Sequence, residues 1–245
     1  MVPVRRLYSK LPLELRDRIR PLKHARIAFT APPAPERLWH TEPISRQYGF
    51  DRGTPIDRYY IERFLAAHAE DIRGHVLEVQ DAAYTRRFGG DRVTCSDVLH
   101  VDPGHAGVTV VADLSDAPGI TSSTFDCIIL TQTLAFLPDL DAAARTLARI
   151  LKPEGVLLVT TAGITRICDH EDELWGHYWN FTRRSLELIF GEPFADGTLE
   201  IESFGNVLSA ICSLQGLAAE DLAPAELDLL DELYPVLLGA RATRS

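Results

Sequence analysis

The feature that most constrains the fold is a series of short aliphatic runs, most of which show no alternation of polar and apolar residues. Such runs predict strands that are buried on both faces, which is the pattern of a parallel sheet covered by helices on both sides. We expect seven of these strands. They lie at residues 75–79, 92–96, 108–112, 125–131, 155–161, 198–204 and 234–242.

Amphipathic segments between these runs predict the covering helices. The clearest one, at residues 140–151, places its apolar side chains on one stripe, with Asp139 or Asp141 near its start and Pro153 near its end. The sequence therefore predicts an α/β fold, a seven-stranded Rossmann-like doubly wound sheet with helices on both faces. The other helical segments are expected at residues 53–72, with Pro55 in the first turn, and at 206–217 and 224–233.

The composition fits a single soluble domain. With 245 residues, of which 46% are hydrophobic and 24% are charged, the chain is long enough to bury a sizeable core. No apolar run approaches the roughly 20 residues of a membrane-spanning helix, and the first residues lack the apolar core of a signal peptide. We therefore expect a cytoplasmic protein without a membrane span.

The cysteines and acidic loops contain no metal-binding motif. The four cysteines lie more than 30 residues apart, so there is no CxxC pair. The stretch DHEDE at residues 169–173 is rich in acids, but consecutive side chains cannot all converge on one ion. We expect no metal site.

Charge divides the chain into a predicted arm and linker at residues 1–42 and a predicted domain at residues 43–245. The formal net charge is −10, yet residues 1–30 carry eight Lys or Arg against two acids. The arm has two interpretations: a surface helix for anionic lipid or an acidic partner, or a solvated helix that packs on its own domain. The acidic remainder argues against nucleic acid as the main partner, because phosphate binding needs a cationic face. The oligomeric state is left open.

Polar residues stand at the ends of the predicted strands. In a doubly wound sheet, ligands bind at the carboxyl ends of the strands, near the point where the strand order reverses. We therefore expect these side chains to converge on one ligand. They are Glu78, Asp97, Asp113, Thr131, Gln132 and Thr133.

This order of strands, helices and acids resembles the class I S-adenosylmethionine-dependent methyltransferases over roughly residues 43–242. The most recognisable stretch is LARILKPEGVLLVTT at residues 147–161, in which Glu154 replaces a glycine of the family's pattern. The resemblance implies the doubly wound fold, S-adenosylmethionine as the cofactor and a small-molecule acceptor.

The same resemblance assigns cofactor-binding roles at the strand ends. Glu78 matches the acid that ends the first strand, and Asp97 matches the acid that takes the ribose hydroxyls, with Asp102 as a weaker candidate. A carboxylate suits that role because it can accept two hydrogen bonds from a vicinal diol. The turn after the third strand would border the adenine, and the turn after the fourth would face cofactor or substrate. Their matching residues are Asp113 and Leu114, then Thr131 and Gln132.

The turn after the first strand departs from the family. Three glycines are usual there, but the matching positions hold Gln80, Ala82 and Tyr84. Glycine in this turn permits backbone torsions that other residues rarely adopt and lets the cofactor approach closely. We still expect Val79 and Gln80 to border the cofactor, with the Gln80 side chain close to its methionine part.

A second departure lies in ELWGHYWNFT at residues 173–182, which resembles a bacterial subgroup often linked with sugar or natural-product pathways. His177 stands where relatives carry an acid. It is a candidate general base, because an imidazole with a pKa of about 6.5 accepts a proton at neutral pH; the alternative is a histidine packed among aromatic neighbours. Those neighbours, Trp175, Tyr178 and Trp179, line a substrate pocket in one interpretation and belong to the core in the other.

Arg52 is the last candidate. A guanidinium before the first helix can clamp a carboxylate of the cofactor or substrate. The alternative is a surface ion pair with Asp51 or Asp57.

These features predict methyl transfer from S-adenosylmethionine to an oxygen of a sugar or polyketide-like natural product, with His177 as the base. Two alternatives stay open. A methyltransferase-fold enzyme can catalyse a non-methylating step such as cyclisation or elimination, because chemistry belongs to the site and not to the fold. The chain could also be a non-catalytic partner in such a pathway, docked through its arm.

Overall fold

The computed structural model describes residues 41–168 and 173–245. The predicted arm lies almost entirely outside these ranges, so both of its interpretations stay predictions. Among the described residues, no helix combines the length and the apolar character that crossing a membrane requires.

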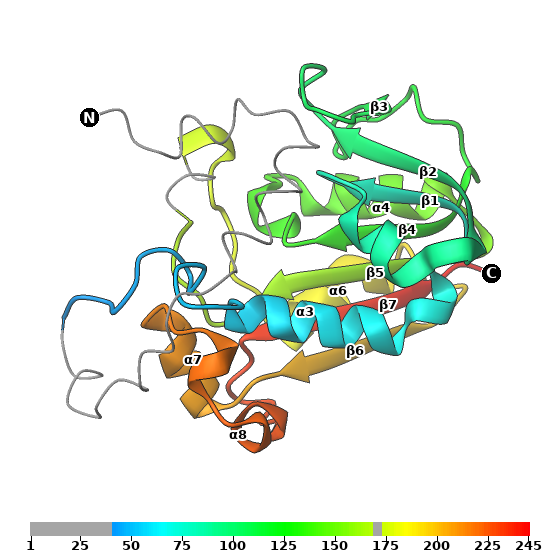
Figure 1. The fold of residues 1–245 in the computed structure, drawn as a ribbon. Coiled ribbons are helices and arrows are strands. Elements are labelled where there is room, and N and C mark those ends of the chain that lie inside the picture. Colours follow the sequence, from blue (N-terminus) through cyan, green and yellow to red (C-terminus); the bar gives the residue numbers. More distant parts are fainter. Residues whose placement is uncertain (1–40, 169–172) are drawn as a thin grey trace.

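A seven-stranded sheet forms the centre of the fold, in the order β3-β2-β1-β4-β5-β7-β6 (Figure 1). Strands β1 to β5 pair in parallel, and β7 runs antiparallel between β5 and β6. The order reverses between β1 and β4, as in a doubly wound sheet, which confirms the predicted fold class. The strands are β1 (Gly74–Val79), β2 (Val93–His100), β3 (Val110–Val111), β4 (Phe125–Thr131), β5 (Leu151–Ala162), β6 (Leu199–Phe204) and β7 (Leu237–Thr243).

Helices cover both faces of this sheet (Figure 1). One face packs against α3 and the other against α4 and α6, while α7 and α8 lie between β6 and β7 in the chain. Asp139 caps α4, because its carboxylate accepts a hydrogen bond from the Ala142 N–H at 2.9 Å. The helices are α3 (Ile56–Ala67), α4 (Leu140–Ile150), α6 (Arg183–Gly191), α7 (Val207–Leu214) and α8 (Pro224–Asp228).

The absence of polar alternation in the strands has a direct structural cause. Val76 packs in the core on the α3 face and Leu77 packs in the core on the α4 face, and both are fully buried. Successive side chains of a strand point to opposite faces, so a strand between two cores is apolar at every position.

Several boundaries differ from the prediction. β2 extends to His100, four residues beyond the predicted end, and β3 shrinks to Val110–Val111. Residues 101–124, all of them described, contain no helix, so the connections from β2 to β4 are loops. Pro153 does not end α4, because the chain leaves that helix at Leu151, which already pairs with β4. Pro55 precedes α3 as its cap residue instead of lying in its first turn.

Candidate functional site

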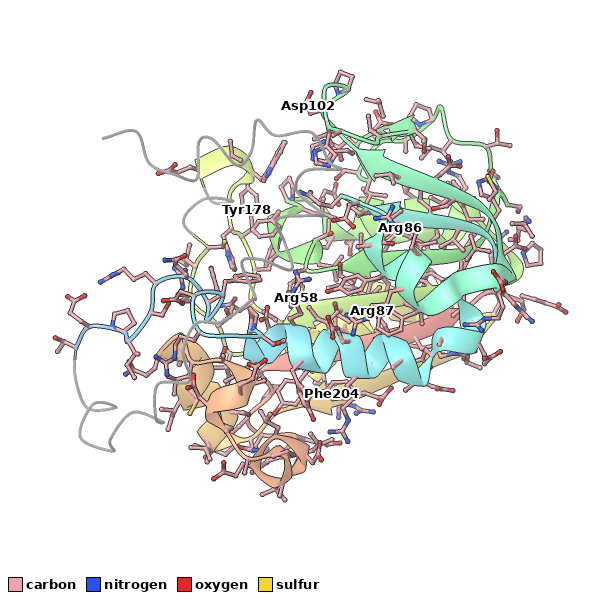
Figure 2. All side chains as sticks on the ribbon, in the orientation of Figure 1. Arg58, Arg86, Arg87, Asp102, Tyr178 and Phe204 are labelled. Carbon is pink, nitrogen blue, oxygen red and sulfur yellow. The ribbon has the colours of Figure 1, made fainter. Side chains whose placement is uncertain are left out.

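The loops that follow β1, β2, β4 and β5 meet at one edge of the sheet, on the left of Figure 1, which we call the carboxyl edge. These strands are parallel, so all their carboxyl ends lie there, and the strand order reverses between β1 and β4. Doubly wound sheets bind their ligands at this place. Figure 2 shows Asp102, Tyr178 and Arg58 along the same edge.

In the turn after β1, a residue other than glycine has a backbone conformation that is typical of glycine. Gln80 has a φ of +83°, in the region that only glycine adopts at little cost. Its N–H donates to the Leu99 carbonyl at 3.0 Å, and its own carbonyl lies 2.6 Å from Nε2 of His105. β2 and the loop that follows it therefore hold Gln80 in a strained conformation, and its side chain is exposed at the carboxyl edge.

Glu78 supports this turn from inside the protein. Its side chain is only 2% exposed, and its two carboxylate oxygens accept hydrogen bonds from the N–H groups of Tyr84 at 3.1 Å and Thr85 at 2.7 Å. Burial raises the pKa of Glu78 to about 7, although those hydrogen bonds favour the charged form. The structure thus assigns Glu78 to the backbone of the following turn, in place of the predicted direct contact with a cofactor. Val79 is partly buried against the core on the α4 face.

Asp97 does not end the second strand, so the position predicted for it is wrong. It lies opposite Leu77 in the middle of the β1–β2 pair, and β2 continues to His100. Its carboxylate is 2.6 Å from Nε2 of His75 and also accepts a hydrogen bond from Oγ1 of Thr109 at 2.6 Å. These partners lie toward the amino end of β1, away from the carboxyl edge.

Two histidines and an acid occupy the end of β2 instead. The rings of His100 and His105 stack with their centroids 3.9 Å apart, and the Trp175 ring meets His100 edge-on. Burial and the neighbouring His105 lower the pKa of His100, which favours a neutral ring. Asp102, the weaker candidate from the sequence, follows the strand end, where its exposed carboxylate accepts the Gly104 N–H at 2.8 Å.

The turn after β3 gives its two candidates different environments. Asp113 is exposed, and its carboxylate accepts the Ser115 N–H at 2.8 Å. Leu114 is 2% exposed and packs in the core on the α4 face. Contact of either residue with a cofactor stays a prediction.

The turn after β4 contains a buried polar group that lacks a partner. Thr131 ends β4, and Gln132 follows it with a φ of +49° while its N–H donates to the Thr160 carbonyl at 2.8 Å. The side-chain nitrogen of Gln132 is buried and has no hydrogen-bond partner within the described ranges. The same holds for the hydroxyls of Thr160 and Thr161 on β5. A buried amide without an acceptor costs about 1–3 kcal/mol, so a ligand atom that accepted its hydrogen bond would remove this penalty.

Both ring nitrogens of His177 have partners. Nδ1 accepts the Cys168 N–H at 3.3 Å, and Nε2 lies 3.3 Å from Oδ1 of Asn180. This pairing places the ring hydrogen on Nε2. The ring also packs edge-on against Phe136, with the centroids 5.5 Å apart.

The three aromatic candidates are held at the surface of the carboxyl edge. Trp175, Tyr178 and Trp179 are 41%, 53% and 43% exposed, which argues against the core interpretation. The backbone N–H of Tyr178 donates to the Ala135 carbonyl at 2.8 Å, and the indole of Trp179 donates to the Leu137 carbonyl at 2.9 Å. The loop after β5 is therefore fastened to the loop after β4.

Arg52 has a partner that the sequence did not indicate. Its guanidinium donates to both carboxylate oxygens of Asp221, at 2.7 and 2.6 Å. The predicted alternatives Asp51 and Asp57 do not form this pair. Two guanidinium nitrogens of Arg52 are thus occupied by the two carboxylate oxygens of Asp221. This pairing indicates a structural role for Arg52 and does not support its assignment to the cofactor.

Sequence reasoning missed His100, His105 and Arg58. The guanidinium of Arg58, on α3, lies 5.9 Å from the centre of the Tyr84 ring in the turn after β1. Each of the three lies in or near a predicted element: the histidines follow the second strand, and Arg58 lies within the helix predicted at residues 53–72. A longer second strand would have placed His100 at the site.

Comparison with known proteins supports the fold assignment. The family described as "Methyltransferase domain" matches residues 80–159. No curated sequence matches the chain significantly.

Solved structures share the architecture at low sequence identity. A SAM-dependent methyltransferase from Archaeoglobus fulgidus is 11% identical, with 79% of this chain and 96% of that chain covered and a TM-score of 0.52. A methyltransferase from Mesorhizobium loti is 15% identical, with 77% and 98% covered and a TM-score of 0.51. The N-methyltransferase NodS from Bradyrhizobium japonicum, in complex with S-adenosyl-L-homocysteine, is 17% identical, with 86% and 96% covered and a TM-score of 0.50. At these identities the likeness shows the fold.

Proposed function

We propose that the chain is a class I S-adenosylmethionine-dependent methyltransferase and that it methylates an oxygen of a small-molecule acceptor. A sugar or another natural product is the acceptor class we favour. A role in natural-product biosynthesis and a cytoplasmic location belong to the same proposal.

The observation that carries the proposal is the backbone of Gln80. At the position where the family has a glycine, this chain keeps a φ of +83° with a side chain that pays a steric penalty for it. A turn that had lost its ligand would have little reason to keep that conformation. Its retention supports a turn that still contacts the cofactor.

The carboxyl edge fits the cofactor in its donor and acceptor groups. The buried Gln132 amide lacks an acceptor, and the exposed Asp102 carboxylate follows β2, where an acid would accept hydrogen bonds from the ribose diol. In this proposal Gln132 and Asp102 hold the adenosine part, Asp113 borders its base and Gln80 borders its methionine part. S-Adenosylmethionine supplies a methyl group that is already activated on a sulfonium, so the protein mainly has to align donor and acceptor.

The loop after β5 offers the acceptor site in this proposal. Trp175, Tyr178 and Trp179 present exposed aromatic surface at the carboxyl edge, which suits the apolar face of a sugar or an aromatic natural product. His177 would remove the hydroxyl proton. The ring hydrogen now lies on the Nε2 side, toward Asn180. This role therefore requires the acceptor to displace Asn180 and the ring hydrogen to move to Nδ1, which gives up the hydrogen bond from the Cys168 N–H.

Calorimetric titration with S-adenosylhomocysteine tests the cofactor assignment. We expect saturable one-to-one binding that Gln132→Ala weakens about tenfold, the equivalent of one hydrogen bond of about 1.4 kcal/mol. Gln215→Ala is the matched control, since the Gln215 side chain already has a protein partner and accepts the Ile44 N–H at 3.2 Å. No binding at millimolar ligand would reject the proposal.

The role of His177 is tested with active enzyme once an acceptor is found. If His177 is the base, His177→Gln should lose activity, and the fall in activity at acidic pH should disappear from the pH profile of the remaining activity. A purely structural role predicts that His177→Gln, which keeps hydrogen-bonding groups, retains both while His177→Ala does not.

The exposed Gln80 side chain favours one alternative function. It adds bulk where the family leaves space, so the fold could serve a non-methylating step in natural-product assembly. That alternative predicts turnover that is unaffected by S-adenosylhomocysteine, whereas dose-dependent inhibition by this product supports methyl transfer.

A further inference from the structure

Three side chains with metal-binding groups lie together on the amino-terminal half of β1 and the neighbouring part of β2. In the parallel pairing of these strands, His75 is opposite Cys95 and Leu77 is opposite Asp97. Residues in register share a face, as do residues two apart on one strand, so His75, Cys95 and Asp97 all point to the same side of the sheet. The carboxyl edge lies at the other end of these strands (Figure 1).

The ligand atoms of the three side chains are close enough to share one ion. One ring nitrogen of His75, Sγ of Cys95 and one carboxylate oxygen of Asp97 all lie within 4.8 Å of one another. The second carboxylate oxygen of Asp97 accepts a hydrogen bond from Oγ1 of Thr109 at 2.6 Å. Thr109 therefore fixes the carboxylate from outside, as groups around a metal ligand commonly do.

The surroundings keep this cluster accessible to solvent. Cys95 is exposed and has a free thiol, and the side chains of His75 and Asp97 are 25% and 23% exposed. The His75 ring is oriented by edge-on packing against Phe125, with the centroids 4.8 Å apart.

We propose that His75, Cys95 and Asp97 form a binding site for a divalent transition-metal ion of the zinc class. A thiolate, an imidazole and a carboxylate are the three ligand types that zinc takes in proteins, whereas magnesium and calcium take oxygen alone. The fourth position faces solvent and takes a water molecule. The ion links β1 to β2 away from the carboxyl edge. This proposal therefore does not depend on the acceptor proposed above.

Binding requires small, defined changes. The Cys95 thiol gives up its proton to solvent and ligates as a thiolate. The ion takes the place of the hydrogen between Nε2 of His75 and the Asp97 carboxylate; that hydrogen moves to Nδ1 by exchange with solvent, so the ring stays neutral. These two atoms are 2.6 Å apart, and tetrahedral zinc holds such ligands about 3.3 Å apart, a change that side-chain rotation supplies.

Cobalt(II) titration of the full reduced chain tests the site, because thiolate ligation gives a charge-transfer band in the near ultraviolet. We expect one equivalent to bind, the band to appear, and zinc to displace it. Cys95→Ser removes the band and weakens binding at least tenfold, while Asp97→Asn weakens binding and keeps the band. Cys168→Ser is the control and changes neither, because Cys168 lies in the loop after β5.

Thermal unfolding provides the second measurement. Cys95 is exposed, so Cys95→Ser should unfold at the wild-type temperature in the presence of a chelator. Zinc should raise the unfolding temperature of the wild type and of Cys168→Ser but not that of Cys95→Ser. Absence of saturable binding, a band that survives Cys95→Ser, or equal zinc stabilisation of all three proteins would overturn the proposal.

Discussion

At the scale of single residues, the most informative position is Gln80, because its backbone and its side chain have opposite preferences. A φ of +83° costs a residue with a Cβ about 1–2 kcal/mol. Gln80→Gly would remove this cost from the folded state. Part of the resulting gain in stability is offset, because glycine has greater conformational freedom in the unfolded chain. We expect Gln80→Gly to raise the free energy of unfolding by about 0.5–1 kcal/mol in urea denaturation.

Glu154→Gly is the matched control for Gln80→Gly. Glu154 also replaces a family glycine and has a φ of +61°, but it lies in the exposed turn at the start of β5, away from the carboxyl edge. Both variants should gain stability, and only Gln80→Gly should bind S-adenosylhomocysteine more tightly. Loss of stability in Gln80→Gly would show that the side chain contributes contacts that outweigh the backbone strain.

Glu78 predicts a pH dependence of stability. Its pKa is about 7 in the folded protein because of burial, against an ordinary value of 4.5, so the folded state binds a proton more tightly than the unfolded chain. Its contribution to stability is therefore complete below pH 4.5 and is lost as the pH rises to about 7, by on the order of 3 kcal/mol.

Glu78→Gln removes this titration. We expect the difference in unfolding free energy between wild type and Glu78→Gln to fall between pH 5 and pH 8, measured by urea denaturation at each pH. Glu62→Gln serves as the control for replacing a carboxylate at the surface, where Glu62 pairs with Arg87 at 2.5 Å. A flat difference for Glu78→Gln would mean that Glu78 is solvated in solution.

Single positions also show where sequence spacing fails. Asp97 follows Glu78 by 19 residues and was placed at a strand end, but the register sets Leu77 opposite Asp97 and leaves His100 at that end. His75 and Cys95 are 20 residues apart in the sequence, so no motif links them, and only the pairing of β1 with β2 brings them together. Register depends on the whole sheet and cannot be taken from residue types alone.

At the scale of elements, two helix caps that differ in burial predict different losses of stability when they are removed. Oδ1 of Asn206 accepts the N–H groups of Leu208 and Ser209 at the start of α7, and its amide donates to the carbonyls of Glu226 and Leu229, both at 2.7 Å. Asn206 is 6% exposed. Asn206→Ala should therefore cost about 3 kcal/mol, because it removes a cap and also the two hydrogen bonds that the buried Asn206 amide donates.

Asp139→Ala is the comparison at the start of α4. The Asp139 side chain is exposed and caps through a single N–H at 2.9 Å, so its loss should cost about 1 kcal/mol. Urea denaturation of both variants measures the difference. Equal losses would contradict the importance of the buried bonds from Asn206 to the segment around α8.

The sequence predicts elements well where burial is uniform. β4 was predicted at its observed bounds because each of its faces meets a core. β2 was cut short because its first half is exposed and polar while its second half is buried. The loops at residues 101–124 cover the α4 face without a helix, through Leu114, Ala117 and Ile120, and such a covering has no periodicity to detect.

At the scale of the whole molecule, the segment before α3 is joined to the segment after α7 across more than 160 residues of sequence. The hydroxyl and N–H of Thr54 both donate to Glu220 at 2.8 Å. Arg52 forms its two-pronged pair with Asp221, and their side chains are 16% and 9% exposed. The two segments flank the sheet near the carboxyl edge. These contacts therefore contribute to the stability of that side of the fold.

Arg52→Ala should lower the free energy of unfolding by about 3 kcal/mol, because it leaves the Asp221 carboxylate buried without its cation. Adding Asp221→Ala to Arg52→Ala should cost less than Asp221→Ala alone, with a coupling energy of about 2 kcal/mol in the double-mutant cycle. Both single variants should bind S-adenosylhomocysteine within twofold of the wild type, since the pair is structural. If Arg52→Ala abolished that binding while Asp221→Ala preserved it, Arg52 would be the carboxylate clamp predicted from the sequence, and the Asp221 pair would have to open when the cofactor binds.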